Sequence, residues 1–329
     1  MTGSHRIIID TKHIKYDFTI RRNITVILGD SGSGKTTLVE YLRMYSDRGP
    51  ASGITLQSDV PCVVFTSVAG LWKPLLNEIK HSIIFIDEGQ PFIFTQDFAE
   101  SVKNSDNYYV LITRRPIHNL PYSTKEIYGI RTVGKYSFPE KVYQEFYPIY
   151  ETETEHSLSR NTIFVLEDSN AGYEFFQKAF PKIQCISAGG NAGISAKLHS
   201  INKNSATIVM ADGAAFGAYI ENILSMHPFR KELSIYLPES FEWIILRSGI
   251  IDKTVISEIL EHPEDFIDSS VYFSWERYFT ALLEKETGDD RILHYSKDHL
   301  PEYFLSARNI RKILEVFPDD IKQALSKTR

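Results

Sequence analysis

The stretch "ITVILGDSGSGKTTLVEYL", residues 24–42, constrains the fold of this chain more than any other. An apolar run leads into a glycine-rich turn, and a segment of helical period follows. Gly29, Gly34, Lys35 and Thr36 have the spacing at which backbone N–H groups surround phosphates, the lysine reaches the terminal phosphates and the threonine ligates magnesium. The sequence therefore predicts a phosphate-binding loop between a strand and a helix, rather than a glycine-rich turn without a ligand.

Two further apolar runs end in polar residues. "HSIIFIDEGQ" ends in Asp87 and Glu88. At this place the aspartate can hold the hydration shell of magnesium, and the glutamate can polarise an attacking water. The alternative is an acidic strand end that only caps a helix. "YYVLITRRP" ends in Thr113, Arg114 and Arg115. An arginine at this place can stabilise transition-state charge, in its own chain or toward a neighbouring subunit, or can simply be solvated. Both interpretations stay open.

These motifs resemble the Walker A and Walker B pair of P-loop NTPases, and somewhat the AAA-type and zonula-occludens-toxin-type ATPases. No L-S-G-G-Q motif occurs, which disfavours an ABC-type ATPase. The resemblance implies ATP and Mg²⁺ as ligands, with Lys35 and Glu88 as catalytic residues and Thr36 and Asp87 at the metal. The residues expected to hold the nucleotide are Gly29, Asp30, Ser31, Gly32, Ser33, Gly34, Lys35, Thr36, Thr37 and Arg114.

Carboxylates also end strands in the second half of the chain. "TIFVLEDSNAGYEFFQKAFP" is a strand ending in Glu167 before a helix, "KIQCISAGGNAGISAKL" is a strand, a glycine-rich turn and a helix, and "ATIVMADGAAFGAY" is a strand ending in Asp212. Carboxylates at the carboxyl ends of adjacent parallel strands converge, where they can hold magnesium or manganese. Metals held in this way activate water for phosphodiester cleavage.

Residues from about 160 to 220 resemble a TOPRIM domain, the metal-binding fold of topoisomerases, primases and OLD-family nucleases. The resemblance implies that Glu167 is a metal ligand or general acid/base and that Asp212 is the first aspartate of a D-x-D motif, with Mg²⁺ or Mn²⁺ bound. Glu242, in "LPESFEWIIL", is a looser match to a further acidic ligand. Two positions depart from the pattern: Asp168 stands where glycine is usual, and Ala214 replaces the second aspartate. Asp168 could supply the missing charge.

The chain has 329 residues, enough for about two domains. The polar stretch "ETETEHSLSR", residues 151–160, is the best boundary. We expect an α/β protein: a P-loop NTPase domain with a parallel sheet over residues 1–150, and a TOPRIM-like α/β domain over residues 151–329 with amphipathic helices from about Tyr219 onward. Residues 1–150 carry 17 basic and 15 acidic side chains, and residues 151–329 carry 19 and 27. Nucleic-acid binding would therefore need a local basic patch or bridging metal ions.

No stretch approaches the roughly 18 apolar residues that cross a bilayer, and no signal-peptide pattern starts the chain. We expect a cytoplasmic protein without membrane contact. Cys62 and Cys185 fit no metal or disulfide spacing, so we interpret both as reduced packing residues.

The leading hypothesis is an ATPase whose TOPRIM-like domain is a metal-dependent, ATP-regulated nuclease acting on nucleic acid. The OLD-like nucleases combine the same parts in bacterial and phage conflict, which implies a role in antiviral defence. One alternative is an ATPase with a catalytically inactive TOPRIM-like domain that serves in binding or assembly. Another is an AAA-like or zonula-occludens-toxin-like assembly ATPase. A homo-oligomer or a protein partner would accompany either alternative.

Overall fold

The computed structural model describes residues 1–29, 34–67, 70–136, 141–150, 162–319 and 321–322. The chain forms two compact units, one from residues 1–150 and 262–274 and the other from residues 151–261 and 275–329. The first unit is thus discontinuous, whereas the sequence pattern assigned residues 262–274 to the second domain. Backbone contacts explain the difference: the Gly3 amide donates to the Glu264 carbonyl at 2.7 Å, and the Asn23 side chain donates to the Phe273 carbonyl at 3.0 Å.

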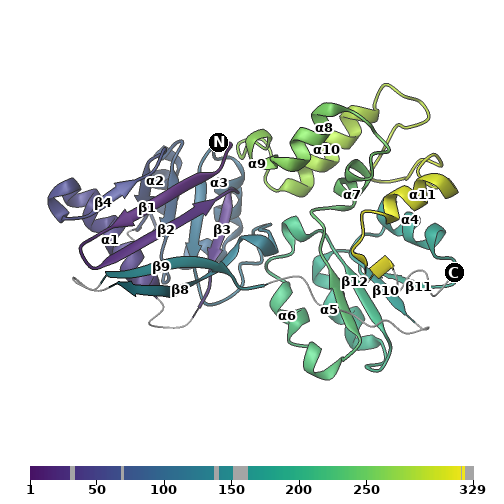
Figure 1. Ribbon diagram of the computed structural model, residues 1–329, viewed down its shortest axis with the longest axis horizontal. Helices are drawn as coiled ribbons and strands as arrows, with labels where there is room; N and C mark the ends of the chain where they lie inside the picture. Colours follow the sequence, from purple (N-terminus) through teal and green to yellow (C-terminus); the bar gives the residue numbers. More distant parts are fainter. Residues whose placement is uncertain (30–33, 68–69, 137–140, 151–161, 320, 323–329) are drawn as a thin grey trace. The chain divides into compact units, whose positions relative to one another are not determined.

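The first unit contains a nine-stranded sheet in the order β4-β1-β2-β9-β8-β3-β7-β6-β5 (Figure 1). Neighbours from β8 to β5 are parallel, whereas β1 is antiparallel to β2 and β4, and β8 is antiparallel to β9. The expectation of a parallel sheet is therefore wrong for its outer part. The strands are β1 (His5–Asp10), β2 (Ile14–Ile20), β3 (Ile24–Ile27), β4 (Thr55–Gln57), β5 (Cys62–Val64), β6 (Ile83–Ile86), β7 (Tyr108–Ile112), β8 (Ile127–Tyr136) and β9 (Lys141–Pro148).

Burial along the strands explains this mixed pairing. Strands β3, β6 and β7 are buried at every residue, as expected for parallel strands covered on both faces. Strands β1 and β2 alternate buried with partly exposed residues, the pattern of antiparallel strands with one wet face. The helices of this unit are α1 (Lys35–Arg48), α2 (Trp72–Glu78), α3 (Gln96–Lys103) and α9 (Pro263–Phe266).

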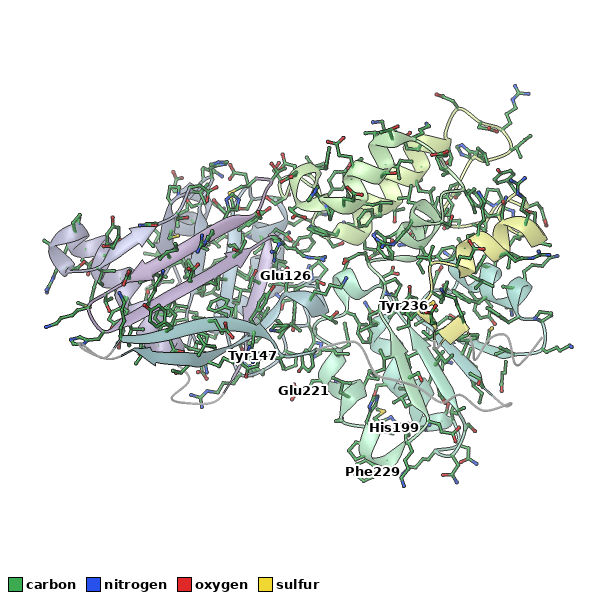
Figure 2. The ribbon with its side chains drawn as sticks, viewed as in Figure 1. Glu126, Tyr147, His199, Glu221, Phe229 and Tyr236 are labelled. Carbon is green, nitrogen blue, oxygen red and sulfur yellow. The ribbon has the colours of Figure 1, made fainter. Side chains whose placement is uncertain are left out.

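A buried ion pair lies at the start of the central strand β3. The Arg22 guanidinium lies 3.6 Å from the Glu126 carboxylate, and the Thr25 hydroxyl donates to the same carboxylate at 3.2 Å. All three side chains are buried. Figure 2 labels Glu126 within the first unit. Because Glu126 immediately precedes β8, these contacts tie β8 to β3 at the start of both strands.

The second unit has a four-stranded parallel sheet in the order β11-β10-β12-β13. Right-handed crossovers place α4 (Ala171–Ala179) on one face and both α5 (Asn191–Ser200) and α6 (Ile220–Leu224) on the other. The sequence predicted only helices beyond about Tyr219, so β13 corrects that expectation. The four residues of β13 are too few to show a strand period in the sequence. Their pairing with β12 makes them a strand. The strands are β10 (Ile163–Leu166), β11 (Gln184–Ser187), β12 (Thr207–Met210) and β13 (Leu233–Tyr236).

Side chains from the C-terminal part pack against α4 and strand β13. The Phe241 ring packs against the rings of Phe175 and Phe176, and the Phe317 ring packs against Phe176 and Tyr236. Throughout the described residues, no helix combines the length and apolar character that a bilayer crossing requires. The added helices are α7 (Phe241–Arg247), α8 (Thr254–Glu261), α10 (Trp275–Thr287) and α11 (Ala307–Leu314).

Candidate functional site

The predicted phosphate loop begins at the carboxyl end of β3 and ends at the first residue of α1. Gly29 and Gly34 have φ angles of 138° and 91°, which side-chain-bearing residues rarely adopt. The Lys35 ammonium donates to the Gly29 carbonyl at 2.5 Å, so it lies close to the start of the loop. Thr36 is exposed and Thr37 half-buried on the first turn of α1. The predicted ligands Asp30, Ser31, Gly32 and Ser33 lie outside the described residues.

Tyr16, which the sequence reasoning missed, supports this loop from β2. Its hydroxyl donates to the Gly34 carbonyl at 2.8 Å, and burial raises the pKa of this tyrosine, so it stays a neutral donor. A Cβ atom at residue 34 would lie 3.2 Å from the same hydroxyl. Gly34 is therefore required both for its backbone angle and for this close approach.

Strand order brings the two other motifs to the same edge of the sheet. Strand β7 lies between β3 and β6, with Ile112 paired to Ile27 and Leu111 paired to Ile86. The residues that follow the three strands, including Asp87 and Thr113, therefore lie at one level beside the loop. Neighbouring strands are about 4.8 Å apart, which places the ends of β3 and β6 roughly 10 Å apart.

Glu88 and Arg114 form an ion pair across this edge. The Arg114 Nε lies 2.9 Å from the Glu88 carboxylate, and both side chains are exposed. The Glu88 amide donates to the Asp87 carboxylate at 2.8 Å. Thr113 is buried, and its hydroxyl donates to the Arg115 carbonyl at 3.0 Å. The structure thus joins Glu88 directly to Arg114, whereas sequence reasoning assigned the two residues separate roles.

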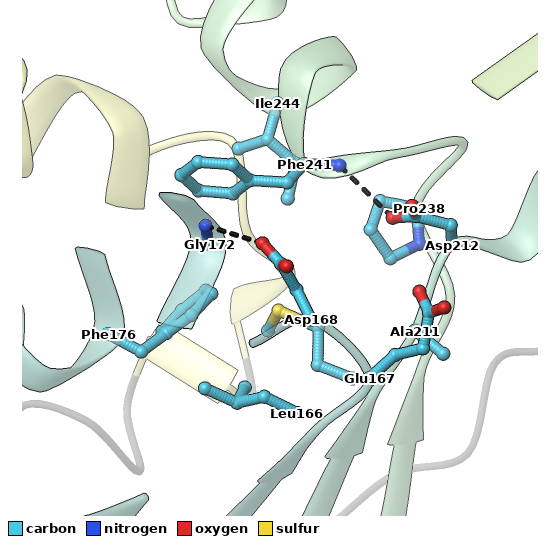
Figure 3. A pocket seen from close by; sticks show the side chains of 11 residues that line it. Leu166, Glu167, Asp168, Gly172, Phe176, Ala211, Asp212, Pro238, Phe241 and Ile244 are labelled. Atoms are coloured by element: carbon cyan, nitrogen blue, oxygen red, sulfur yellow. Dashed lines mark hydrogen bonds between the residues drawn. The ribbon is translucent and has the colours of Figure 1, made fainter. Parts of the chain in front are cut away.

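In the second unit, Glu167 and Asp212 follow two neighbouring parallel strands. Leu166 of β10 is paired with Met210 of β12, and the Glu167 amide continues this ladder by donating to the Met210 carbonyl at 2.9 Å. Figure 3 shows the two carboxylates at the ends of these strands. They line a cavity of about 20 Å³, which has room for one water molecule or ion.

Burial and mutual repulsion make these carboxylates reluctant to ionise. Burial is the main cause and the charge of Glu276 a further one of a rise in the pKa of Glu167 to about 7. Burial also raises the pKa of Asp212 well above its ordinary value, with contributions from Glu276, Glu167 and Glu242. A divalent cation would relieve this repulsion, so the donor set suits a hard metal ion.

Glu242 lies beside this cluster, held by a tyrosine. It is buried on α7, and the Tyr295 hydroxyl donates to its carboxylate at 2.7 Å. Burial raises the pKa of Glu242, and the charge of Lys297 opposes that rise. The looser sequence match thus falls within electrostatic reach of Asp212.

Glu276 and Lys297 belong to this cluster, although no sequence motif indicated them. The Lys297 ammonium lies 2.7 Å from the Glu276 carboxylate at the start of α10. Burial lowers the pKa of Lys297, but the charges of Glu276, Glu242 and Asp212 raise it overall. Lys297 therefore stays a cation that partly neutralises the acidic cluster.

Asp168 lines the same cavity as Glu167 and Asp212, and backbone amides hold its carboxylate. Its two carboxylate oxygens accept from the amides of Asn170 and Gly172, at 2.9 and 2.7 Å, where α4 begins. Figure 3 draws the bond from Gly172. Ala214 is 3% exposed and does not line the cavity. Among the described residues, no three His, Cys, Asp or Glu side chains are arranged to hold a metal ion. Coordination would therefore need side chains to move from these positions.

Comparison with models of protein families, with curated proteins and with solved structures finds no match to this chain. The geometry alone therefore supports the proposals that follow.

Proposed function

We propose that the first unit binds ATP with Mg²⁺ and hydrolyses it. The observation that carries this proposal is the in-register order β3-β7-β6, which gathers three polar strand ends at one edge. A glycine-bordered loop ahead of a helix N-terminus stands at the same edge, and such a loop is a ready anion site. No single motif would carry the same weight without this convergence.

Each residue then has a chemical role. The loop amides and Lys35 would neutralise the phosphates, while Thr36 and Asp87 would hold Mg²⁺, which offsets the charge that develops during phosphoryl transfer. Glu88 would orient the attacking water and accept its proton. Because Arg114 holds the Glu88 carboxylate, that ion pair would open or rotate for Glu88 to accept the proton of the attacking water.

The test is ATP binding and hydrolysis by the purified full chain with Mg²⁺. We expect phosphate release that requires Mg²⁺, and retention of an ATP analogue. Failure to bind the analogue at millimolar concentration would refute the proposal. Binding without phosphate release would leave a nucleotide-binding unit and remove the hydrolytic role.

For the second unit, we propose metal-dependent cleavage of phosphodiester bonds under the control of ATP. The supporting observation is the pair Glu167 and Asp212 beside a cavity of ion size. Glu276 adds a third carboxylate close enough to raise the pKa of both. Mg²⁺ or Mn²⁺ would activate water there, while Glu167 and Asp212 bind the ion and Lys297 offsets the remaining negative charge.

One alternative has a specific observation in its favour: a second unit that keeps the fold without the chemistry. Both Asp168 oxygens are engaged by backbone amides, and Ala214 supplies no carboxylate. A cleavage assay on single-stranded and duplex nucleic acid with Mg²⁺ or Mn²⁺ separates the two proposals. Cleavage that EDTA abolishes supports the nuclease, and intact substrate with every metal supports the inactive module.

Replacing Glu276 by glutamine is expected to weaken Mn²⁺ binding by about 10- to 100-fold, the range typical of residues that support a metal site. The physical reason is loss of a carboxylate whose charge acts on both Glu167 and Asp212. Calorimetric titration with Mn²⁺ measures the change. Glu221→Gln, at an exposed position of α6, is the matched control. Equal affinities for the two variants would remove Glu276 from the metal site.

A further inference from the structure

A second cavity of the same unit lies away from the acidic cluster. It has a volume of about 500 Å³ and opens between α5, α6 and the segment that precedes β13. This face of the sheet is opposite to the one covered by α4. Arg230 lies ahead of β13 and His199 near the end of α5, so the cavity is at the amino ends of the strands. Glu167 and Asp212 follow the carboxyl ends, so the cavity does not share their site.

The cavity is basic although the unit is acidic. Its lining includes Lys203, Arg230 and His199 but no carboxylate. Within the described part of the chain, Lys203 has no ion-pair partner. The second unit, residues 151–261 and 275–329, carries 24 acidic and 19 basic side chains, so this basic lining contrasts with the unit around it. An anion is therefore the ligand that the electrostatics favour.

Arg230 offsets the negative charge that the carboxyl end of α5 would present to an anion in this cavity. The carboxyl end of a helix presents partial negative charge, which repels anions. The buried Arg230 guanidinium donates to the Leu198, Ile201 and Asn202 carbonyls at the end of α5, at 2.6 Å for Ile201 and 3.3 Å for Asn202. These carbonyls are thereby neutralised, so Lys203 and His199 can act on a ligand.

One wall of the cavity is aromatic. Phe229 is 72% exposed, and Met226 lines the cavity beside it. Figure 2 labels both Phe229 and His199, which line the same cavity from different segments. An exposed ring next to cationic side chains matches a nucleotide unit, whose base stacks on the ring while its phosphate meets the cations. The hydroxyl and amide groups of Ser195, Asn222 and Ser225 add polar partners for sugar or base edges.

We propose that this cavity binds one nucleotide of a single-stranded nucleic acid, at a site separate from the acidic cluster. Only a strand with unstacked bases can place a base flat on Phe229, so a duplex fits poorly. The inference rests on the nucleic-acid partner of the proposed function, but it does not require cleavage.

The test is binding of a fluorescent single-stranded oligonucleotide to the full chain in EDTA, measured by anisotropy at several salt concentrations. Phe229→Ala is expected to weaken binding by about 5- to 100-fold through loss of stacking. Lys203→Gln is expected to weaken binding and to reduce the slope of log affinity against log salt by about 0.7, the contribution of one phosphate contact on a single strand. DNA and RNA strands are measured separately.

Two variants serve as matched controls. Ile292→Ala removes another exposed apolar side chain of this unit, which is 69% exposed, and Lys178→Gln removes a lysine of α4 on the opposite face. Both are expected to bind the oligonucleotide like the parent. All four variants should keep the parent rate of ATP hydrolysis, or the parent melting temperature if the parent shows no hydrolysis, which excludes general misfolding as the cause of weaker binding.

Each outcome decides the proposal. Equal binding by the parent, Phe229→Ala and Lys203→Gln overturns it, as does the absence of oligonucleotide binding. Binding of a nucleoside monophosphate or inorganic phosphate, with no binding of the oligonucleotide, also overturns it and makes the cavity a site for small anions. Duplex binding as tight as single-strand binding contradicts the stacking argument. If the parent binds as expected but cleaves nothing with Mg²⁺ or Mn²⁺, the cavity stands and the nuclease proposal falls.

Discussion

Replacing Glu88 by glutamine is expected to slow ATP hydrolysis by about 10²- to 10⁴-fold and to leave ATP affinity close to that of the parent. Glutamine preserves the size of the side chain and can still contact Arg114, but it cannot accept a proton from the attacking water. The loss should therefore be confined to turnover. Phosphate release under saturating ATP measures turnover, and equilibrium binding of labelled ATP measures affinity.

Two comparison variants sharpen this test. Lys35→Ala should weaken ATP binding itself, because it removes the ammonium that lies at the loop. Glu100→Gln, at an exposed position of α3, should leave both quantities unchanged. If Glu88→Gln hydrolysed ATP at the parent rate, Glu88 would be only the ion-pair partner of Arg114. If it also lost ATP affinity as Lys35→Ala does, the proposed division between binding and catalysis would be wrong.

Replacing Glu167 by glutamine is expected to have two opposite effects. Metal-dependent cleavage should fall by about 10²- to 10⁴-fold, because a ligand and general acid/base is lost. Stability in EDTA at pH 8 should rise by about 1 to 3 kcal/mol, because a carboxylate whose pKa is raised to about 7 no longer has to ionise beside Glu276 and Asp212. Gain of stability on loss of function is common where a site holds unfavourable charge.

The stabilisation expected for Glu167→Gln should depend on pH. A carboxylate with a raised pKa binds its proton more tightly in the folded than in the unfolded protein. Its contribution therefore favours folding at low pH, and that contribution is lost as the pH rises from the ordinary value of 4.5 to about 7. Thermal unfolding in EDTA should show the stabilisation by Glu167→Gln at pH 8 and little of it at pH 4.5. Glu221→Gln should show no such trend, and a stabilisation independent of pH would contradict the electrostatic explanation.

Local motifs predicted the strand ends of both units because each motif lies within one strand and the turn after it. Gly29 and Asp87 in the first unit, and Glu167 and Asp212 in the second, could all be placed by the rule that parallel strands end at one edge. The same rule could not order the strands. Strand β9 pairs with β2, and β8 pairs with β3, although the paired residues are far apart in sequence. The periodicity of hydrophobic residues within one strand does not predict which other strand it pairs with.

The parts of the site that could not be predicted come from segments without a motif. Tyr16 stands in a strand of ordinary alternation, and Glu276 and Lys297 stand in a helix and a loop about 65 and 85 residues after Asp212. The contacts of Asp168 could not be predicted for a different reason. It stands next to Glu167 in sequence and three residues before α4 begins, where the amides of Asn170 and Gly172 bind its two oxygens.

The discontinuous first unit has a consequence for how the protein is made. Gly3 and Asn23 contact a segment that leaves the ribosome only after most of the second unit has been synthesised. A fragment cut at Tyr150 would therefore lack part of its own domain, and the nascent first unit has to wait for residue 274 before its last contacts form. Lys297, which belongs to the acidic cluster, follows residue 274 by 23 residues. The first unit can therefore form its last contacts before the acidic cluster of the second unit is complete.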